Sequence, residues 1–270
     1  MGSSTMQPLD TFREADRVRI QGVFADIDDT ITSDGHLTAD AYRALERLQQ
    51  SGLKVFPITG RPAGWCDHIA RMWPVDGVVG ENGAFYFHYD HKKREFNKRY
   101  MLSDAERAAN RATYASVMDE ILAQIPGAAV ASDQLYREAD LAIDFCEDVD
   151  PLDDAQIDQI VAMMEARGMT AKISSIHVNG WFGEYEKLSM TKLMMSEVFN
   201  VDLDAEKENF VFVGDSPNDQ PMFAFFPHAI GVANLADIET RLASKPTYIT
   251  TAAAGAGFVE VAAALLAARG

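Results

Sequence analysis

Short apolar strands that alternate with helices constrain this chain more than any other feature of its sequence. Residues 23–25 predict a buried strand, residues 38–52 a helix and residues 54–58 a second strand. A helix that reaches Met72 and a third short strand at residues 77–80 follow. Strand, helix, strand, helix, strand in this order is typical of a parallel sheet that helices cover on both faces.

The pattern changes in the middle of the chain and then returns. The middle block predicts an α+β module, with helices at 103–124 and 153–167 and strands at 141–145, 170–173 and 176–178. The alternation then resumes with a helix at 189–199, strands at 210–213, 229–232 and 248–249, and a terminal helix from Phe258. We therefore predict an α/β fold with a Rossmann-like parallel-sheet core at residues 17–83 and 187–270 and an inserted α+β cap domain at residues 84–186.

The composition excludes several classes of partner. The 270 residues include 41 Asp and Glu against 24 Lys and Arg, a net charge of −17. A protein that neutralises nucleic-acid phosphates or docks on an anionic membrane is rarely so acidic, so we expect neither partner. Cys66 and Cys146 stand outside any disulfide or metal-ligand pattern and favour a reducing compartment. With no secretory signal and no apolar run of membrane-spanning length, the chain is expected to be cytoplasmic.

Three polar loops follow strands that the alternation places in one sheet. They are residues 26–30 (Asp-Ile-Asp-Asp-Thr), 59–61 (Thr-Gly-Arg) and 214–219 (Gly-Asp-Ser-Pro-Asn-Asp). Ligands of open α/β sheets bind beyond the carboxyl ends of the strands, so these loops would bring together four carboxylates, those of Asp26, Asp28, Asp215 and Asp219. Like charges this close need a cation, and oxygen ligands without a histidine or cysteine cluster suit Mg²⁺ better than zinc.

In this order, each at a strand end, the loops resemble the motifs of the haloacid dehalogenase (HAD) superfamily, specifically its Cof-type (subfamily IIB) sugar-phosphate phosphatases. The first loop is similar to the family's D-x-D-x-T, the second to its T-G-R and the last to its G-D-x-x-N-D. Asn82-Gly83-Ala84 is similar to the segment that closes the first half of the core in this family. The resemblance covers nearly the whole chain, and it implies a HAD core with a large C2-type cap inserted between the second and third motifs.

The resemblance implies a phosphatase, a phosphoric monoester hydrolase, that acts through an aspartyl-phosphate intermediate. Asp26 would attack phosphorus, while Asp28 would protonate the leaving oxygen and later deprotonate the attacking water. Mg²⁺ would be held by Asp26, by the backbone carbonyl of Asp28 and by Asp215. The phosphate and substrate would be bound by six residues, namely Thr59, Gly60, Arg61, Lys187, Asn218 and Asp219.

The lysine of the third motif has two candidates. Lys187 and Lys192 both lie close to the start of the helix that precedes the last motif. The position at the helix start favours Lys187, although Glu186 and Leu188 stand where the family usually has serine and glycine. Both lysines therefore stay open as the phosphate ligand, and alanine variants of each would separate them.

The inserted module would select the substrate, because the core supplies only phosphate chemistry. Residues 174–185 mix hydroxyl, amide, carboxylate and aromatic side chains that suit a sugar. His177 and Trp181 in this stretch, and Asn82 beside the core loops, are candidate specificity residues; a structural histidine and a buried tryptophan are the alternative interpretation. We expect a small-molecule phosphorylated substrate, with a sugar phosphate as the favoured class.

Two other functions fit the same residues. A phosphosugar mutase similar to phosphomannomutase shares the architecture and the pair of Asp26 and Asp28, but it returns the phosphoryl group to a sugar. A non-catalytic sugar-phosphate sensor would keep the fold without turnover, and the intact pair weighs against it, because a binder needs no nucleophile. Product analysis separates the hydrolase from the mutase. Neither the particular sugar nor the oligomeric state follows from these residues.

Overall fold

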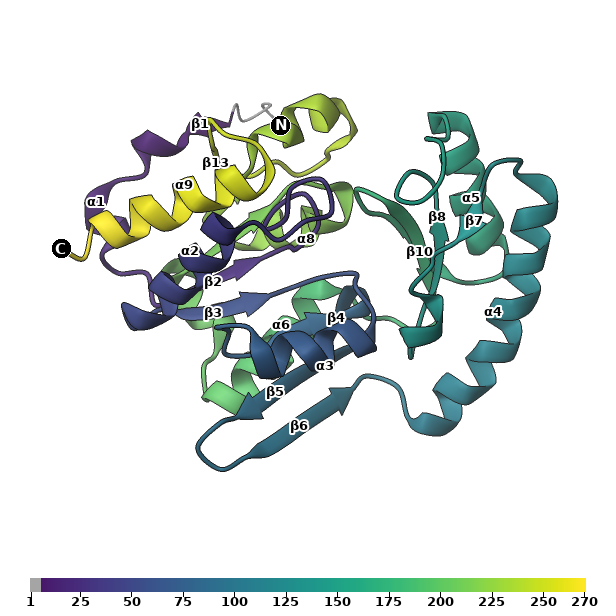
Figure 1. Cartoon of the computed structure of the whole chain (residues 1–270), viewed down its shortest axis with the longest axis horizontal. Helices are drawn as coiled ribbons and strands as arrows, with labels where there is room; N and C mark the ends of the chain where they lie inside the picture. The colour runs from purple at the N-terminus through teal and green to yellow at the C-terminus, as the bar shows by residue number, and fades with distance from the viewer. Residues whose placement is uncertain (1–5) are drawn as a thin grey trace.

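A six-stranded parallel sheet forms the centre of the larger part of the molecule (Figure 1). The computed structural model describes residues 6–270. Neighbouring strands pair in parallel, in the order β1-β13-β12-β11-β2-β3. Their bounds are β1 Gln7–Pro8, β2 Gly22–Ala25, β3 Lys54–Pro57, β11 Phe210–Gly214, β12 His228–Gly231 and β13 Tyr248–Ile249. The carboxyl ends of these strands share one edge, so the loops after β2, β3 and β11 meet there.

Helices cover both faces of this sheet because side chains alternate along each strand. Val23 points into an apolar cluster with helices α2 and α9, and Phe24 points into a second cluster with helices α6 and α8. A fully buried side chain of this size contributes about 1.5–3 kcal/mol through its burial. The helices of this part are α1 Glu14–Arg17, α2 Ala39–Gln50, α3 Ala63–Met72, α6 Lys187–Phe199, α7 Leu203–Glu206, α8 Gln220–Phe225 and α9 Ala254–Ala267.

An antiparallel sheet of three strands extends the core beyond β3. It has the order β4-β5-β6, with bounds β4 Val78–Gly80, β5 Phe85–Asp90 and β6 Glu95–Tyr100. A parallel bridge between Ile58 and Val79 links it to the end of β3. Phe85 and Phe87 belong to the same apolar cluster as Val23, so the hairpin of β5 and β6 packs on the core, from which it projects in Figure 1.

The inserted module has a sheet and an apolar centre of its own (Figure 1). Its four antiparallel strands have the order β7-β8-β10-β9, and helices α4 and α5 pack on them through a separate apolar cluster. Ser103 and Asp153 begin the two helices with capping boxes, in which side chains satisfy the first free backbone N–H groups. The bounds are α4 Asp104–Gln124, β7 Ala129–Val130, β8 Leu141–Asp144, α5 Asp154–Ala166, β9 Thr170–Ile173 and β10 His177–Trp181.

The predicted architecture, a parallel-sheet α/β core with an inserted α+β module, is confirmed. The division at residues 84–186 stays a prediction, although the hairpin of β5 and β6 that it assigns to the cap packs on the core. Two helices begin earlier than predicted, α6 at Lys187 and α9 at Ala254. The first turn of α9 is rich in glycine, a poor helix former, and its packing on α2 outweighs that low propensity. Within residues 6–270, no helix is both long and apolar enough to span a bilayer.

Candidate active site

Strand register places Asp26 between the two other polar loops. Ala25 lies opposite Val213 in the pairing of β2 with β11, and the Asp26 N–H donates to the Val213 carbonyl at 2.9 Å. The loop of residues 214–219 begins at the next residue of β11. On the other side of β2, the Ile58 N–H donates to the Ala25 carbonyl at 2.8 Å, which aligns the loop after β3 with the same site.

Three carboxylates of this site lie close together in the interior. Oxygens of Asp26, Asp215 and Asp219 lie within 4.8 Å of one another, and the three residues are 5%, 4% and 0% exposed. Burial, together with the neighbouring carboxylates, raises the pKa of Asp26 to about 8, against the opposing effect of a nearby lysine. Burial and the charges of Asp26 and Asp219 also raise the pKa of Asp215 well above its usual range. Burial and mutual repulsion therefore disfavour the ionised form of these carboxylates, which a bound cation would favour.

A single buried lysine reaches two of the three carboxylates. Nζ of Lys187 lies 2.6 Å from Oδ1 of Asp26 and 2.7 Å from Oδ1 of Asp219, and the residue is 1% exposed. Burial acts to lower the pKa of Lys187, but the charges of Asp219 and Asp26 outweigh it and raise that pKa. Lys192, the other candidate, pairs with Asp204 at 2.6 Å. Its side chain is far more exposed than that of Lys187. Of the two lysines, the structure places only Lys187 beside Asp26.

The donors of the cluster fit a hard cation. Asp219 is already engaged, because its oxygens accept the backbone N–H groups of Asp215 and Ser216 and the Lys187 ammonium. Asp215 is oriented by the Thr30 hydroxyl at 2.9 Å. Carboxylate oxygens of Asp26 and Asp215 remain as the first-choice ligands, and a divalent cation would offset their repulsion. The backbone carbonyl that the sequence adds to this set stays a prediction.

Side-chain amides and a glycine form a small cradle next to the cluster. Nδ2 of Asn218 donates to Oδ1 of Asn82 at 3.1 Å, and Oδ1 of Asn218 accepts from Lys187 at 3.3 Å. Nδ2 of Asn82 is buried with no hydrogen-bond partner in the structure. A Cβ added to Gly60 would lie 3.1 Å from that nitrogen, so glycine leaves this space open. With the buried Thr59 beside it, the cradle offers an unpaired donor, Nδ2 of Asn82, to an anion such as phosphate.

A strained turn holds Asn82 in the cradle. Glu81, Asn82 and Gly83 have φ values of 43°, 54° and 107°, a left-handed run that costs on the order of 1–3 kcal/mol for each non-glycine residue. A Cβ on Gly83 would lie 2.2 Å from the carbonyl oxygen of Glu186. Only glycine therefore permits the start of α6, and with it Lys187, to approach this closely.

Arg61 points to Asp28 and to the cap. Its Nε and a terminal nitrogen lie 2.9 Å and 2.7 Å from Oδ1 of Asp28. Two cap carboxylates join it, Glu147 at 2.5 Å and Asp133 at 3.3 Å, and the Trp65 ring lies 4.4 Å from the guanidinium carbon. The sequence predicts Arg61 as a phosphate or substrate ligand; the structure places it in an ion-pair network across the boundary of core and cap.

Two of the predicted specificity residues, His177 and Trp181, lie in different surroundings from each other. His177, at the start of β10, is buried with Nε2 2.9 Å from Oε2 of Glu147, so it belongs to the network around Arg61. Burial raises the pKa of Glu147, but its contacts with His177 and Arg61 outweigh burial and lower that pKa to about 2. Trp181 stacks on Tyr185 in the apolar core and is 1% exposed, so the structure does not bring it to the site.

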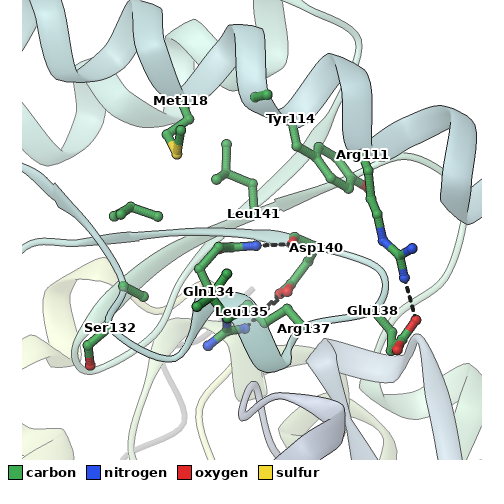
Figure 2. Close-up of a pocket in the computed structure, with 13 residues that line it drawn as sticks. Arg111, Tyr114, Met118, Ser132, Gln134, Leu135, Arg137, Glu138, Asp140 and Leu141 are labelled. Atoms are coloured by element: carbon green, nitrogen blue, oxygen red, sulfur yellow. Dashed lines mark hydrogen bonds and ion pairs between the residues drawn. The ribbon is translucent and has the colours of Figure 1, made fainter.

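Three cap residues of the site were missed from the sequence: Asp133, Arg137 and Glu147. Arg137 is buried between Asp133 and Asp140, and it donates to the carbonyl of Gly60 at 2.9 Å. Figure 2 shows Arg137 against Asp140 at the base of a cap pocket. These residues lie in irregular loops of an inserted module, where no periodic pattern marks them. The only available signal was the acidic run that follows β8.

Comparisons with known proteins agree with this geometry. Residues 23–118 match a family model described as haloacid dehalogenase-like hydrolase. No curated protein sequence matches the chain.

Solved structures share the fold over almost the whole chain. The C-terminal domain of a C. albicans trehalose-6-phosphate phosphatase superposes with a TM-score of 0.71 at 12% identity, covering 98% of this chain and 99% of its own. A Thermoplasma acidophilum protein has a TM-score of 0.68 at 17% identity, with 92% and 98% covered. The sucrose-phosphatase of Synechocystis, solved with sucrose and phosphate, has a TM-score of 0.60 at 16% identity, with 91% and 98% covered. At these identities the likeness concerns the fold.

Proposed function

We propose that this chain, whose residues 23–118 match the haloacid dehalogenase-like hydrolase model, is an Mg²⁺-dependent phosphatase that hydrolyses a small sugar phosphate through an aspartyl-phosphate. The observation that carries this proposal is the contact of the Lys187 ammonium with Asp26, 2.6 Å away, inside a cluster of three buried carboxylates. A surface acidic patch has no need of a buried lysine, whereas a phosphoryl-transfer site needs both a nucleophile and cationic groups around it.

The proposed reaction has two displacements. In the first, an oxygen of Asp26 forms a bond to phosphorus while the ester P–O bond breaks, and the leaving oxygen takes a proton from Asp28. In the second, water bonds to phosphorus and gives its proton to Asp28, and the bond between Asp26 and phosphorus breaks. Lys187 and the cradle of Gly60, Asn82 and Asn218 would hold the phosphoryl oxygens. Mg²⁺, held by Asp26 and Asp215, would supply positive charge to the transferring group.

A sugar phosphate is the substrate class that the surroundings favour. The cap brings Asp133, Glu147 and His177 to the site, and carboxylate and imidazole groups hydrogen-bond hydroxyl groups well. The same carboxylates disfavour a leaving group with further negative charge. Two proteins of the same fold are named as trehalose-6-phosphate phosphatase and sucrose-phosphatase. The net charge of −17 and the free thiols of Cys66 and Cys146 support the remaining parts of the proposal, a cytoplasmic location without nucleic-acid or membrane partners.

Phosphate release from a panel of sugar and other metabolite phosphates tests this function. Each compound is assayed with Mg²⁺, with a chelator, and with the Asp26→Asn protein. Asp40→Asn, which changes an exposed aspartate of α2, is the matched control. We expect release that needs Mg²⁺ and Asp26 and that the control retains.

Each alternative has its own outcome. An isomerised sugar phosphate without free phosphate would identify a mutase. Binding of sugar phosphates without any turnover would identify a sensor. Equal release by wild type and Asp26→Asn would contradict the covalent mechanism.

A further inference from the structure

One arginine joins the general acid of the core to the cap. Both nitrogens of Arg61 that contact Asp28 fall on the same oxygen, Oδ1, at 2.9 Å and 2.7 Å. Oδ2 of Asp28 is therefore the oxygen left to carry the proton. Across the boundary the same guanidinium meets Glu147 through two nitrogens, at 2.5 Å and 3.3 Å. A bidentate contact of this kind fixes the plane of the guanidinium as well as its position.

We propose that Glu147, held by His177, is a positioning residue of the cap that sets Arg61 against Asp28 and so aligns the general acid. The inference rests on the proposed function, because Glu147 would act only through the proposed general acid, Asp28. It also makes proton donation depend on the cap: Arg61 has its full set of partners only when the cap lies on the core.

The loop that carries Glu147 is built to hold it in place. The carboxylate of Asp144, at the end of β8, accepts the backbone N–H groups of Cys146, Glu147 and Asp148 at 2.8–2.9 Å. His177 lies opposite Asp144 in the pairing of β10 with β8 and meets Oε2 of Glu147 at 2.9 Å. Oε2 of Glu147 thus faces both His177 and Arg61, while Oε1 faces Arg61. Strand pairing and three backbone hydrogen bonds set this geometry.

The other cap carboxylate that contacts Arg61, that of Asp133, has a different role. Asp133 lies 3.3 Å from Arg61 but binds Arg137 more closely, at 2.9 Å, as well as through a second nitrogen at 3.3 Å. Its charge is therefore shared with a second buried arginine. Glu147 makes the shorter contact with Arg61 and has no second arginine, so it is the cap residue on which the orientation of Arg61 depends.

The proposal makes a prediction about leaving groups. When the ester P–O bond breaks, the oxygen of a sugar leaves as a strongly basic alkoxide and takes the proton of Asp28. The oxygen of 4-nitrophenyl phosphate leaves as a stable phenolate and needs no proton. Hydrolysis of the aspartyl-phosphate is common to both esters, so the comparison uses kcat/KM, which reports only the steps up to loss of the leaving group. A misaligned Asp28 should lower kcat/KM for the sugar phosphate and hardly lower it for the aryl ester, whereas a general loss of structure lowers both.

The test compares Glu147→Gln with wild type on the best sugar phosphate of the panel and on 4-nitrophenyl phosphate. We expect kcat/KM for the sugar phosphate to fall about 10–100-fold, and kcat/KM for the aryl ester to fall less than about threefold. Glu120→Gln, which alters another cap glutamate paired with an arginine, should leave both unchanged. In the double variant with Asp28→Asn, the added change should cost nothing further, because the two residues act on one proton.

Two outcomes would overturn the inference while leaving the proposed function intact. Equal losses of kcat/KM on both esters would make Glu147 a structural residue. No loss on either ester would show that Glu147 does not contribute to catalysis. Should Glu147→Gln fail to fold, His177→Ala gives the same comparison with a smaller expected effect. A wild-type protein that releases phosphate from neither ester would contradict the proposed function, and the inference with it.

Discussion

The Glu81 carboxylate of the core accepts a hydrogen bond of 2.6 Å from the backbone N–H of Ala139 in the cap. It also accepts the N–H groups of Glu138 and of Ala63, the first residue of α3. Glu81 is completely buried, and its neighbour Asn82 belongs to the phosphate cradle. One strained turn thus fixes the cap, the helix after the second motif and the cradle together.

Replacement of Glu81 by alanine should destabilise the protein strongly. Three buried backbone N–H groups would lose their acceptor, which predicts a loss of about 2–4 kcal/mol in the free energy of unfolding. Urea denaturation measures it, with Glu46→Ala on the exposed face of α2 as control. Glu81→Gln keeps one acceptor oxygen and should lose less. A loss within about 0.5 kcal/mol for Glu81→Ala would show that water replaces the carboxylate.

The two candidate lysines should differ sharply in activity. Lys187→Ala removes the only buried ammonium among the described neighbours of Asp26, so kcat for phosphate release should fall by about 10²–10³. Lys192→Ala removes a partly exposed pair with Asp204, so kcat should stay within about twofold. Thermal melting of both variants checks that the protein folds. Equal losses in the two variants would show that burial beside Asp26 does not decide the role.

The convergence of the polar loops could be predicted from the sequence because parallel strands share a carboxyl edge. Asp26 and Asp215 each follow an apolar strand, and the register of β2 with β11 brings them together as expected. The choice between Lys187 and Lys192 could not be made in this way. Both lysines lie on one helix, and only tertiary packing shows which of them is buried.

The cap part of the site lay beyond sequence reasoning for a physical reason. Arg61 meets Glu147, which is 86 residues away in an irregular loop, and side chains in such loops have no periodicity that reveals their direction. Trp181 is the opposite case, a residue that the sequence predicts at the site and that the structure does not bring there. An aromatic residue in a polar stretch suggested a sugar contact, but the alternation of β10 points its ring into the apolar core.

Addition of Mg²⁺ should stabilise the protein even without substrate. The buried carboxylates of Asp26 and Asp215 repel one another, and a cation bound between them favours the folded state. At a concentration of about 100 times Kd, Tm should rise by about 5–10 °C. Asp215→Asn should abolish this rise and Asp40→Asn should retain it, with NaCl at equal ionic strength as the reference. The same rise in Asp215→Asn would place the cation elsewhere.

Glu147 should make the stability of the protein depend on pH in the acidic range. Contacts with His177 and Arg61 hold the pKa of Glu147 at about 2 in the folded protein, below the ordinary value of 4.5. A carboxyl with a lowered pKa binds fewer protons when folded, so its contribution is complete above pH about 4.5 and is lost as the pH falls toward 2. Wild type should therefore exceed Glu147→Gln by about 1–3 kcal/mol near neutral pH, and this difference should shrink as the pH falls from about 5 to 3. Urea denaturation of both proteins across this range measures it. A difference independent of pH would mean that Glu147 stabilises the fold by its shape and not by its charge.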